Sequence, residues 1–224
     1  MVLSTYYLMR PWYTRTKHKL PSTKLNLYGK LHRMARRFIP LVLLVIVSAS
    51  CSNSLFKVKP ATELPPLPAA SRSADAGGVT VRVAPLLSDE ESQELFEANL
   101  PVSGVLAVRL ELAFQSGVPV ETSRARFRLR DSENREWKFL KPKEAVSRIM
   151  KANGVTLYNP NAKKQFAQEF GAYALDLKLP LSSEDPRRRG FIFFQTPDKR
   201  PVRSDLQLTL TVERLPQAAT LQLN

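Results

Sequence analysis

The chain has 224 residues and a formal net charge of +14, with two histidines and one cysteine. Residues 1–40 hold nine Lys/Arg and no Asp/Glu, so +14 − 9 leaves only +5 for everything that follows. This distribution gives no support to nucleic-acid binding by the remainder of the chain. A product cut before Cys51 also lacks His18 and His32, which excludes Ser/His/Asp and Cys/His catalysis, His/Cys zinc sites and internal disulfides.

Residues 34–50 have the three-part layout of a signal peptide. A basic pair at 36–37 precedes an apolar stretch at 38–47, and small residues at 48–50 lead to Cys51. The apolar stretch is about 15 Å long as a helix, whereas a bilayer core is roughly 30 Å thick. We therefore expect a cleaved export signal, with a short membrane anchor as the alternative.

The segment that ends in Ala49-Ser50-Cys51 resembles the lipobox of bacterial lipoproteins. The resemblance implies that the Cys51 sulfur is acylated and anchors the exported chain to a membrane. Ser52 is not the Asp that retains such proteins at the inner membrane. In a bacterium with two membranes, the resemblance therefore implies the outer membrane, facing the periplasm. A free cysteine after an ordinary signal peptide is the alternative.

The other boundaries follow from composition. Residues 1–33 form a basic extension, which is either a cytoplasmic segment or not translated, if synthesis begins at Met34. Residues 51–78, which are rich in Pro, Ala and Ser, are predicted to be the lipid anchor and a tether. Residues 79–215 are predicted to form one domain, and residues 216–224 a C-terminal tail.

Within 79–215, alternating apolar residues predict strands, and helical spacing with capping residues predicts helices. The strands are expected at 79–83, 106–114, 124–130, 136–140, 175–179, 190–194 and 206–212. The helices are expected near 89–99, 143–152 and 160–173. Residues 124–130 and 136–140 are predicted to pair as a hairpin, and 190–194 to be a covered central strand. Strands dominate, so we expect a mainly β fold: an antiparallel β-sandwich with an inserted helical segment.

The stretch Phe-Arg-Leu-Arg-Asp-Ser-Glu-Asn-Arg-Glu-Trp at 127–137 and the stretch Arg-Gly-Phe-Ile-Phe-Phe-Gln-Thr-Pro at 189–197 precede a final leucine-alternating strand. This order resembles the telokin-like, immunoglobulin-type domains of secreted and lipid-anchored bacterial proteins, over residues 105–214. The resemblance implies an immunoglobulin-like sandwich that binds or scaffolds other molecules.

Arginines are the candidate binding residues. Four are predicted to share one strand face, and three more to lie in an exposed loop; they are Arg124, Arg126, Arg128, Arg130, Arg187, Arg188 and Arg189. Such clusters favour a polyanionic partner, such as an anionic membrane surface, an anionic glycan or an acidic envelope protein. The alternative is a solvated face with cross-strand partners such as Glu111 or Glu213.

No catalytic residue, metal site or cofactor is predicted. The acidic residues at 89–91 and 131–133 are explained as a helix start and a turn, and calcium at the turn lacks the repeated ligand spacing of a dedicated loop. The aromatics at core spacing are predicted to be buried; they are Trp137, Phe139, Phe166, Phe170, Phe191, Phe193 and Phe194.

Three hypotheses remain for function. The first is a lipid-anchored, non-catalytic binding or scaffolding module of the cell envelope. The second is an envelope protein that binds a ligand in a pocket between the helical insertion and the sandwich. The third is a carboxylate-dependent hydrolase, for which the sequence offers least support.

Overall fold

The computed structural model describes residues 56–115, 117–156 and 158–223. The chain divides into two units, Met1–Cys51 and Ser52–Asn224, and all described residues belong to the second. The predicted basic extension, the signal peptide and Cys51 therefore lie outside the described residues.

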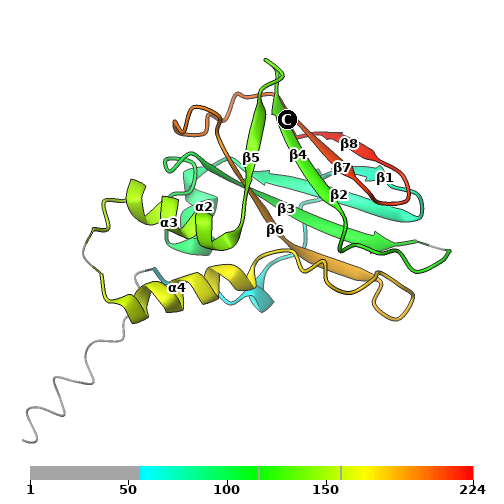
Figure 1. Ribbon diagram of the computed structural model, residues 1–224, viewed down its shortest axis with the longest axis horizontal. Coiled ribbons are helices and arrows are strands. Elements are labelled where there is room, and N and C mark those ends of the chain that lie inside the picture. The colour runs from blue at the N-terminus through cyan, green and yellow to red at the C-terminus, as the bar shows by residue number, and fades with distance from the viewer. Residues whose placement is uncertain (1–55, 116, 157, 224) are drawn as a thin grey trace, which may run out of the picture. The chain divides into compact units, whose positions relative to one another are not determined.

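Eight strands form one antiparallel sheet in the order β1-β2-β3-β6-β5-β4-β7-β8 (Figure 1). Their bounds are β1 Arg72–Asp75, β2 Val79–Leu86, β3 Val105–Phe114, β4 Arg126–Asp131, β5 Glu136–Leu140, β6 Arg187–Gln195, β7 Leu208–Glu213 and β8 Ala219–Gln222. β1 and β8 are the two ends of this sheet, yet they contact each other, so the sheet curls almost into a barrel. The mainly β, antiparallel prediction with helices is confirmed, whereas an immunoglobulin-type sandwich is not.

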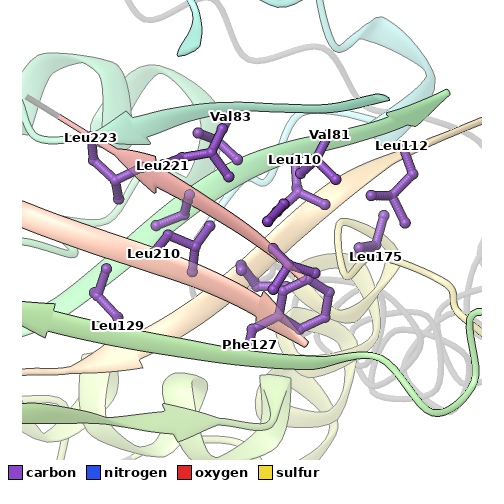
Figure 2. Close-up of a cluster of buried hydrophobic side chains, with 14 of the residues drawn as sticks. Val81, Val83, Leu110, Leu112, Phe127, Leu129, Leu175, Leu210, Leu221 and Leu223 are labelled. Carbon is purple, nitrogen blue, oxygen red and sulfur yellow. The ribbon is translucent and has the colours of Figure 1, made fainter. Parts of the chain in front are cut away.

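The inward faces of these strands enclose the main hydrophobic core. Every second side chain points inward because successive residues of a strand face opposite sides. Figure 2 shows side chains from β2, β3, β4, β7 and β8 converging on one cluster, among them Val81, Leu110, Leu129, Leu210 and Leu221. The alternation in the sequence at 106–112 and 208–212 therefore marked the inward positions correctly.

A second hydrophobic cluster lies on the outer face of the sheet, under three helices that gather on that side (Figure 1). The helices are α2 Asp89–Phe96, α3 Pro142–Ala152 and α4 Pro160–Ala172, as the capping residues predicted. The Ser88 hydroxyl accepts a hydrogen bond from the Glu91 N–H at 3.1 Å, and proline occupies the first position of α3 and of α4. The helical segment thus covers one side of the sheet.

Residues 56–71, which we call the strap, also run along the domain. The Phe56 ring lies 4.7 Å from that of Phe166 on α4, and the Tyr173 hydroxyl donates to the Lys59 carbonyl at 2.5 Å. At the other end, the Arg82 guanidinium donates to the Ser71 hydroxyl at 2.7 Å. The prediction of a free tether over 51–78 is therefore wrong for the strap, because its few apolar residues have a cluster to pack on.

The tether prediction is also wrong at the C-terminal end of its range, and two further predictions are wrong. β1 lies within the predicted tether and pairs with β2 across Gly77 and Gly78, which both have positive φ. β8 lies within the predicted C-terminal tail and pairs with β7. Residues 175–179 do not form a strand: only Ala174 bridges to Phe191, and the Leu175 N–H donates to the Phe191 carbonyl at 3.0 Å.

Candidate partner-binding groove

The predicted arginine stripe lies on β4 and the turn before it. Phe127 and Leu129 are buried, so the intervening Arg126, Arg128 and Arg130 point away from the core. Arg124 is exposed just before the strand. The predicted phase of this strand is therefore confirmed.

The four arginines of the stripe differ in whether an acidic side chain lies close enough to form an ion pair. Arg128 Nε lies 3.5 Å from Glu213 Oε2 on β7, which confirms the predicted pairing to Glu213. Arg130 Nη2 lies 3.7 Å from Glu136 Oε2 on β5. For Arg124 and Arg126, no ion pair within 4 Å is found among the described residues. Arg126 is nevertheless opposite Glu213 in the β4–β7 register, and Arg124 helps to lower the pKa of Glu121, so both have an acidic residue nearby without a close ion pair.

A groove opens beside this end, where β4 and β5 separate. The two strands pair only at Leu129–Trp137 and Arg130–Glu136, whereas residues 138–140 of β5 pair with β6 along the other edge of the strand. The diverging strands are visible in Figure 1. The groove has a volume of about 380 Å³ and is lined by Ala125, Arg126, Phe127, Arg128, Glu136 and Phe139.

Phe139 gives the groove an apolar floor. Its side chain is 44% exposed, and its ring stacks on that of Phe127, with centroids 6.4 Å apart. The sequence predicted Phe139 as a core residue because it follows Trp137 by two residues and so shares its strand face; this prediction is wrong. The other six predicted core aromatics are buried.

The ladder also leaves backbone groups at the groove. The Asp131 N–H donates to the Arg135 carbonyl at 3.2 Å. The backbone groups of Asp131, and of every second residue before it on β4, therefore point towards β5. By the alternation of an antiparallel pair, the backbone N–H and C=O groups of Phe127 and Phe139 also point into the gap, beyond the Leu129–Trp137 pair. The groove thus combines backbone donors and acceptors with an aromatic surface, two arginines and the Glu136 carboxylate.

The other three predicted arginines do not join this site. They lie on β6 rather than in a loop, which is a correction. Arg188 is 9% exposed and donates to Asp185 at 2.8 Å and to the Thr122 hydroxyl at 3.2 Å, so it holds two loops together. Arg189 donates to Glu111 at 2.6 Å, and Arg187 is exposed.

A buried polar cluster on the outer face was missed from the sequence. Arg109 and Glu111 on β3 were assigned to the solvent side, but both are buried. The Arg109 Nε and one terminal nitrogen are buried without a hydrogen-bond partner, and burial, followed by the charge of Arg189, lowers the pKa of Arg109. Burial raises the pKa of neighbouring Tyr173, with Glu63 acting in the same direction. The alternation of β3 carries no signal for this burial, because both residues occupy the face that it assigns to solvent.

The acidic turn after β4 is confirmed, and its carboxylate is fully engaged. Asp131 Oδ1 accepts from the backbone N–H groups of Glu133 and Arg135, and Oδ2 accepts from the Arg135 guanidinium at 2.9 Å. Burial favours the neutral form, but these donors and the Trp137 indole outweigh it and hold the pKa of Asp131 below its ordinary value. Among the described residues, no group of three His, Cys, Asp or Glu is placed to hold a metal ion.

No known family model, curated protein or solved structure matches this chain. In the part of the chain that the structure describes, none of the helices has the length and apolarity needed to cross a bilayer. The groove and the arginine stripe must therefore be interpreted on their own chemistry.

Proposed function

We propose that this protein is a lipid-anchored lipoprotein of the bacterial cell envelope, and that its β domain binds an acidic segment of another envelope protein without catalysis. Export and anchoring rest on the sequence: a signal peptide over 34–50 that ends at Cys51. In a bacterium with two membranes, the proposed location is the outer membrane, facing the periplasm.

The observation that carries the binding role is the groove between β4 and β5. Extended peptides bind at sheet edges through main-chain hydrogen bonds, while side-chain pockets select the sequence. Phe127 and Phe139 offer such main-chain groups together with a stacked aromatic surface. Arg124 and Arg126 add positive charge that suits Asp or Glu in the partner.

The competing ligand-pocket hypothesis is less well supported. The space between the helices and the sheet is filled by packed aromatic rings: Phe96 and Phe170 lie 5.0 Å apart, and Phe170 and Phe193 lie 4.7 Å apart. An immunoglobulin-type ancestry stays a proposal. Its support is that β2 and β3 contribute to the same core as β4 and β7.

The binding role is tested by crosslinking in living cells. A photoreactive amino acid at Phe139 is expected to capture an envelope protein, through a peptide rich in Asp and Glu. The double change Arg126→Glu and Arg128→Glu should reduce capture at least tenfold, because it reverses the charge of the groove. Lys143→Glu with Lys178→Glu is the matched control, since both residues are exposed elsewhere.

Equal capture from a photoreactive group at exposed Leu179 would contradict a specific groove, as would full capture by the arginine variant. The thermal unfolding midpoint of both double variants is measured alongside. The lysine variant should match the parent protein, and the arginine variant should fall only slightly, because the ion pair that it loses, Arg128–Glu213, is partly exposed.

A further inference from the structure

The strap fixes how far the domain can lie from a lipid on Cys51. The strap is packed on α4 from Phe56 onwards. Cys51 precedes Phe56 by five residues, and an extended chain spans at most about 3.6 Å per residue, or roughly 18 Å. A lipid on Cys51 therefore holds the Phe56 end of the domain close to the bilayer surface, with no long spacer between them.

The surface around that end is basic over a continuous stretch. Residues 145–168 contain Arg148, Lys151, Lys163 and Lys164 and no Asp or Glu. Lys151 and Lys164 are exposed, and α3 and α4 pack side by side (Figure 1). Phe166 is six residues from the start of α4, which is about 9 Å of helix. This basic surface is therefore within reach of the anchor.

An amphipathic aromatic side chain lies within this surface. Tyr158 in the α3–α4 connection is 39% exposed, and the Lys163 ammonium lies 5.2 Å from its ring centroid. Tyrosine and lysine are the residues that favour the headgroup region of a bilayer. The acidic helix α2 also contacts the strap near its anchored end: Glu97 Oε2 accepts from the Lys57 N–H at 2.6 Å, and Glu94 Oε1 lies 2.7 Å from Lys59 Nζ. The strap therefore runs between a basic surface on α3 and α4 and an acidic helix.

We propose that the α3–α4 surface, comprising Lys151, Tyr158, Lys163 and Lys164, rests on the anionic phospholipid headgroups of the membrane that holds Cys51. This inference rests on the proposed lipid anchor and adds the orientation of the domain. The α3–α4 side faces the bilayer and lies closer to it than α2 does, because anionic headgroups attract the basic surface and repel the acidic helix. Near an anionic surface, each basic side chain contributes about fivefold to partitioning.

The test uses the mature, acylated chain in vesicles with and without phosphatidylglycerol. Asn161→Cys, Gln93→Cys and Ser132→Cys place one fluorophore each on α4, α2 and the β4–β5 turn, and acylated Cys51 does not react. A nitroxide on the lipid headgroup should quench the label at 161 at least threefold more than the labels at 93 and 132. The difference should shrink in vesicles without phosphatidylglycerol.

The triple change Lys151→Gln, Lys163→Gln and Lys164→Gln should remove most of the quenching at 161. Arg124→Gln, Arg126→Gln and Lys178→Gln together form the charge-matched control and should leave it unchanged. Equal quenching at all three labels, or strongest quenching at 93, on chains that float with the vesicles overturns the orientation alone. Acylated chains that fail to float with the vesicles overturn the anchor, and the orientation with it.

Discussion

At the scale of single residues, Asp131 shows how one side chain stabilises the β4–β5 turn. Four N–H donors, from the Glu133 and Arg135 backbone and the Arg135 and Trp137 side chains, converge on one buried carboxylate. The sequence predicted a turn here from its Asp, Ser and Asn, but nothing in it distinguished the engaged Asp131 from exposed Glu133.

Asp131→Asn should destabilise the domain by about 2 kcal/mol at pH 7, because it leaves buried donors without a charged acceptor. The pKa of Asp131 is lowered on folding, so its contribution is full above its unfolded pKa and is lost as the pH falls through its folded pKa. Denaturant unfolding from pH 7 to pH 2 should therefore show a smaller acid-dependent loss in the variant than in the parent protein. Glu133→Gln is the exposed control; an equal loss in both variants would argue against the Asp131 network.

At the scale of elements, the sequence predicted most strands and all three helices, because alternation and capping residues are local signals. It also assigned a central position to residues 190–194, and β6 does lie between β3 and β5. β1 and β8 were missed because four-residue strands with polar outer faces carry too little pattern. Residues 175–179 alternate like a strand, but this segment pairs with β6 only through one isolated bridge, between Ala174 and Phe191.

Gly190 tests how closely β6 approaches the segment after α4. A Cβ at this position would lie 2.5 Å from the Leu175 Cα and 2.6 Å from its nitrogen, and both are backbone atoms that cannot rotate away. Gly190→Ala should therefore cost about 3 kcal/mol. Gly171→Ala, on α4, meets nothing within 4 Å and should stabilise the domain by about 0.5–1 kcal/mol. Thermal unfolding of both variants measures the effect, and equal unfolding midpoints would contradict the close approach of Gly190 to the Leu175 backbone.

At the scale of the whole molecule, the strap, β1 and β8 show what a sequence pattern cannot supply. Each is defined by a contact with a segment distant in sequence: the strap with α4, and β1 with β8 at the nearly closed seam of the sheet. The same long-range packing buries Arg109 and Glu111 and separates the seven candidate arginines into different surfaces. Of the candidate site, the arginine stripe on β4 was predictable from alternation. The groove beside it was not, because it depends on where β4 and β5 stop pairing, which no local pattern indicates.

Ending the chain after Leu215 should unfold the domain or make it aggregate, although a C-terminal tail would be dispensable. The truncation removes β8, uncovers the edge of β7 and takes Leu221 and Leu223 out of the core. Circular dichroism and size-exclusion chromatography measure the effect, and removal of Asn224 alone is the control. A folded, monomeric truncated domain would show that β8 adds little to the sheet.

The anchor is the claim on which location, orientation and partner all depend. Its most direct measurement is mass spectrometry of the N-terminal peptide of the protein isolated from its native cells. The account predicts that this peptide begins at Cys51 and carries the mass of acyl chains on the cysteine sulfur. A native peptide that still contains His32, or a Cys51 with an unmodified thiol, would contradict it.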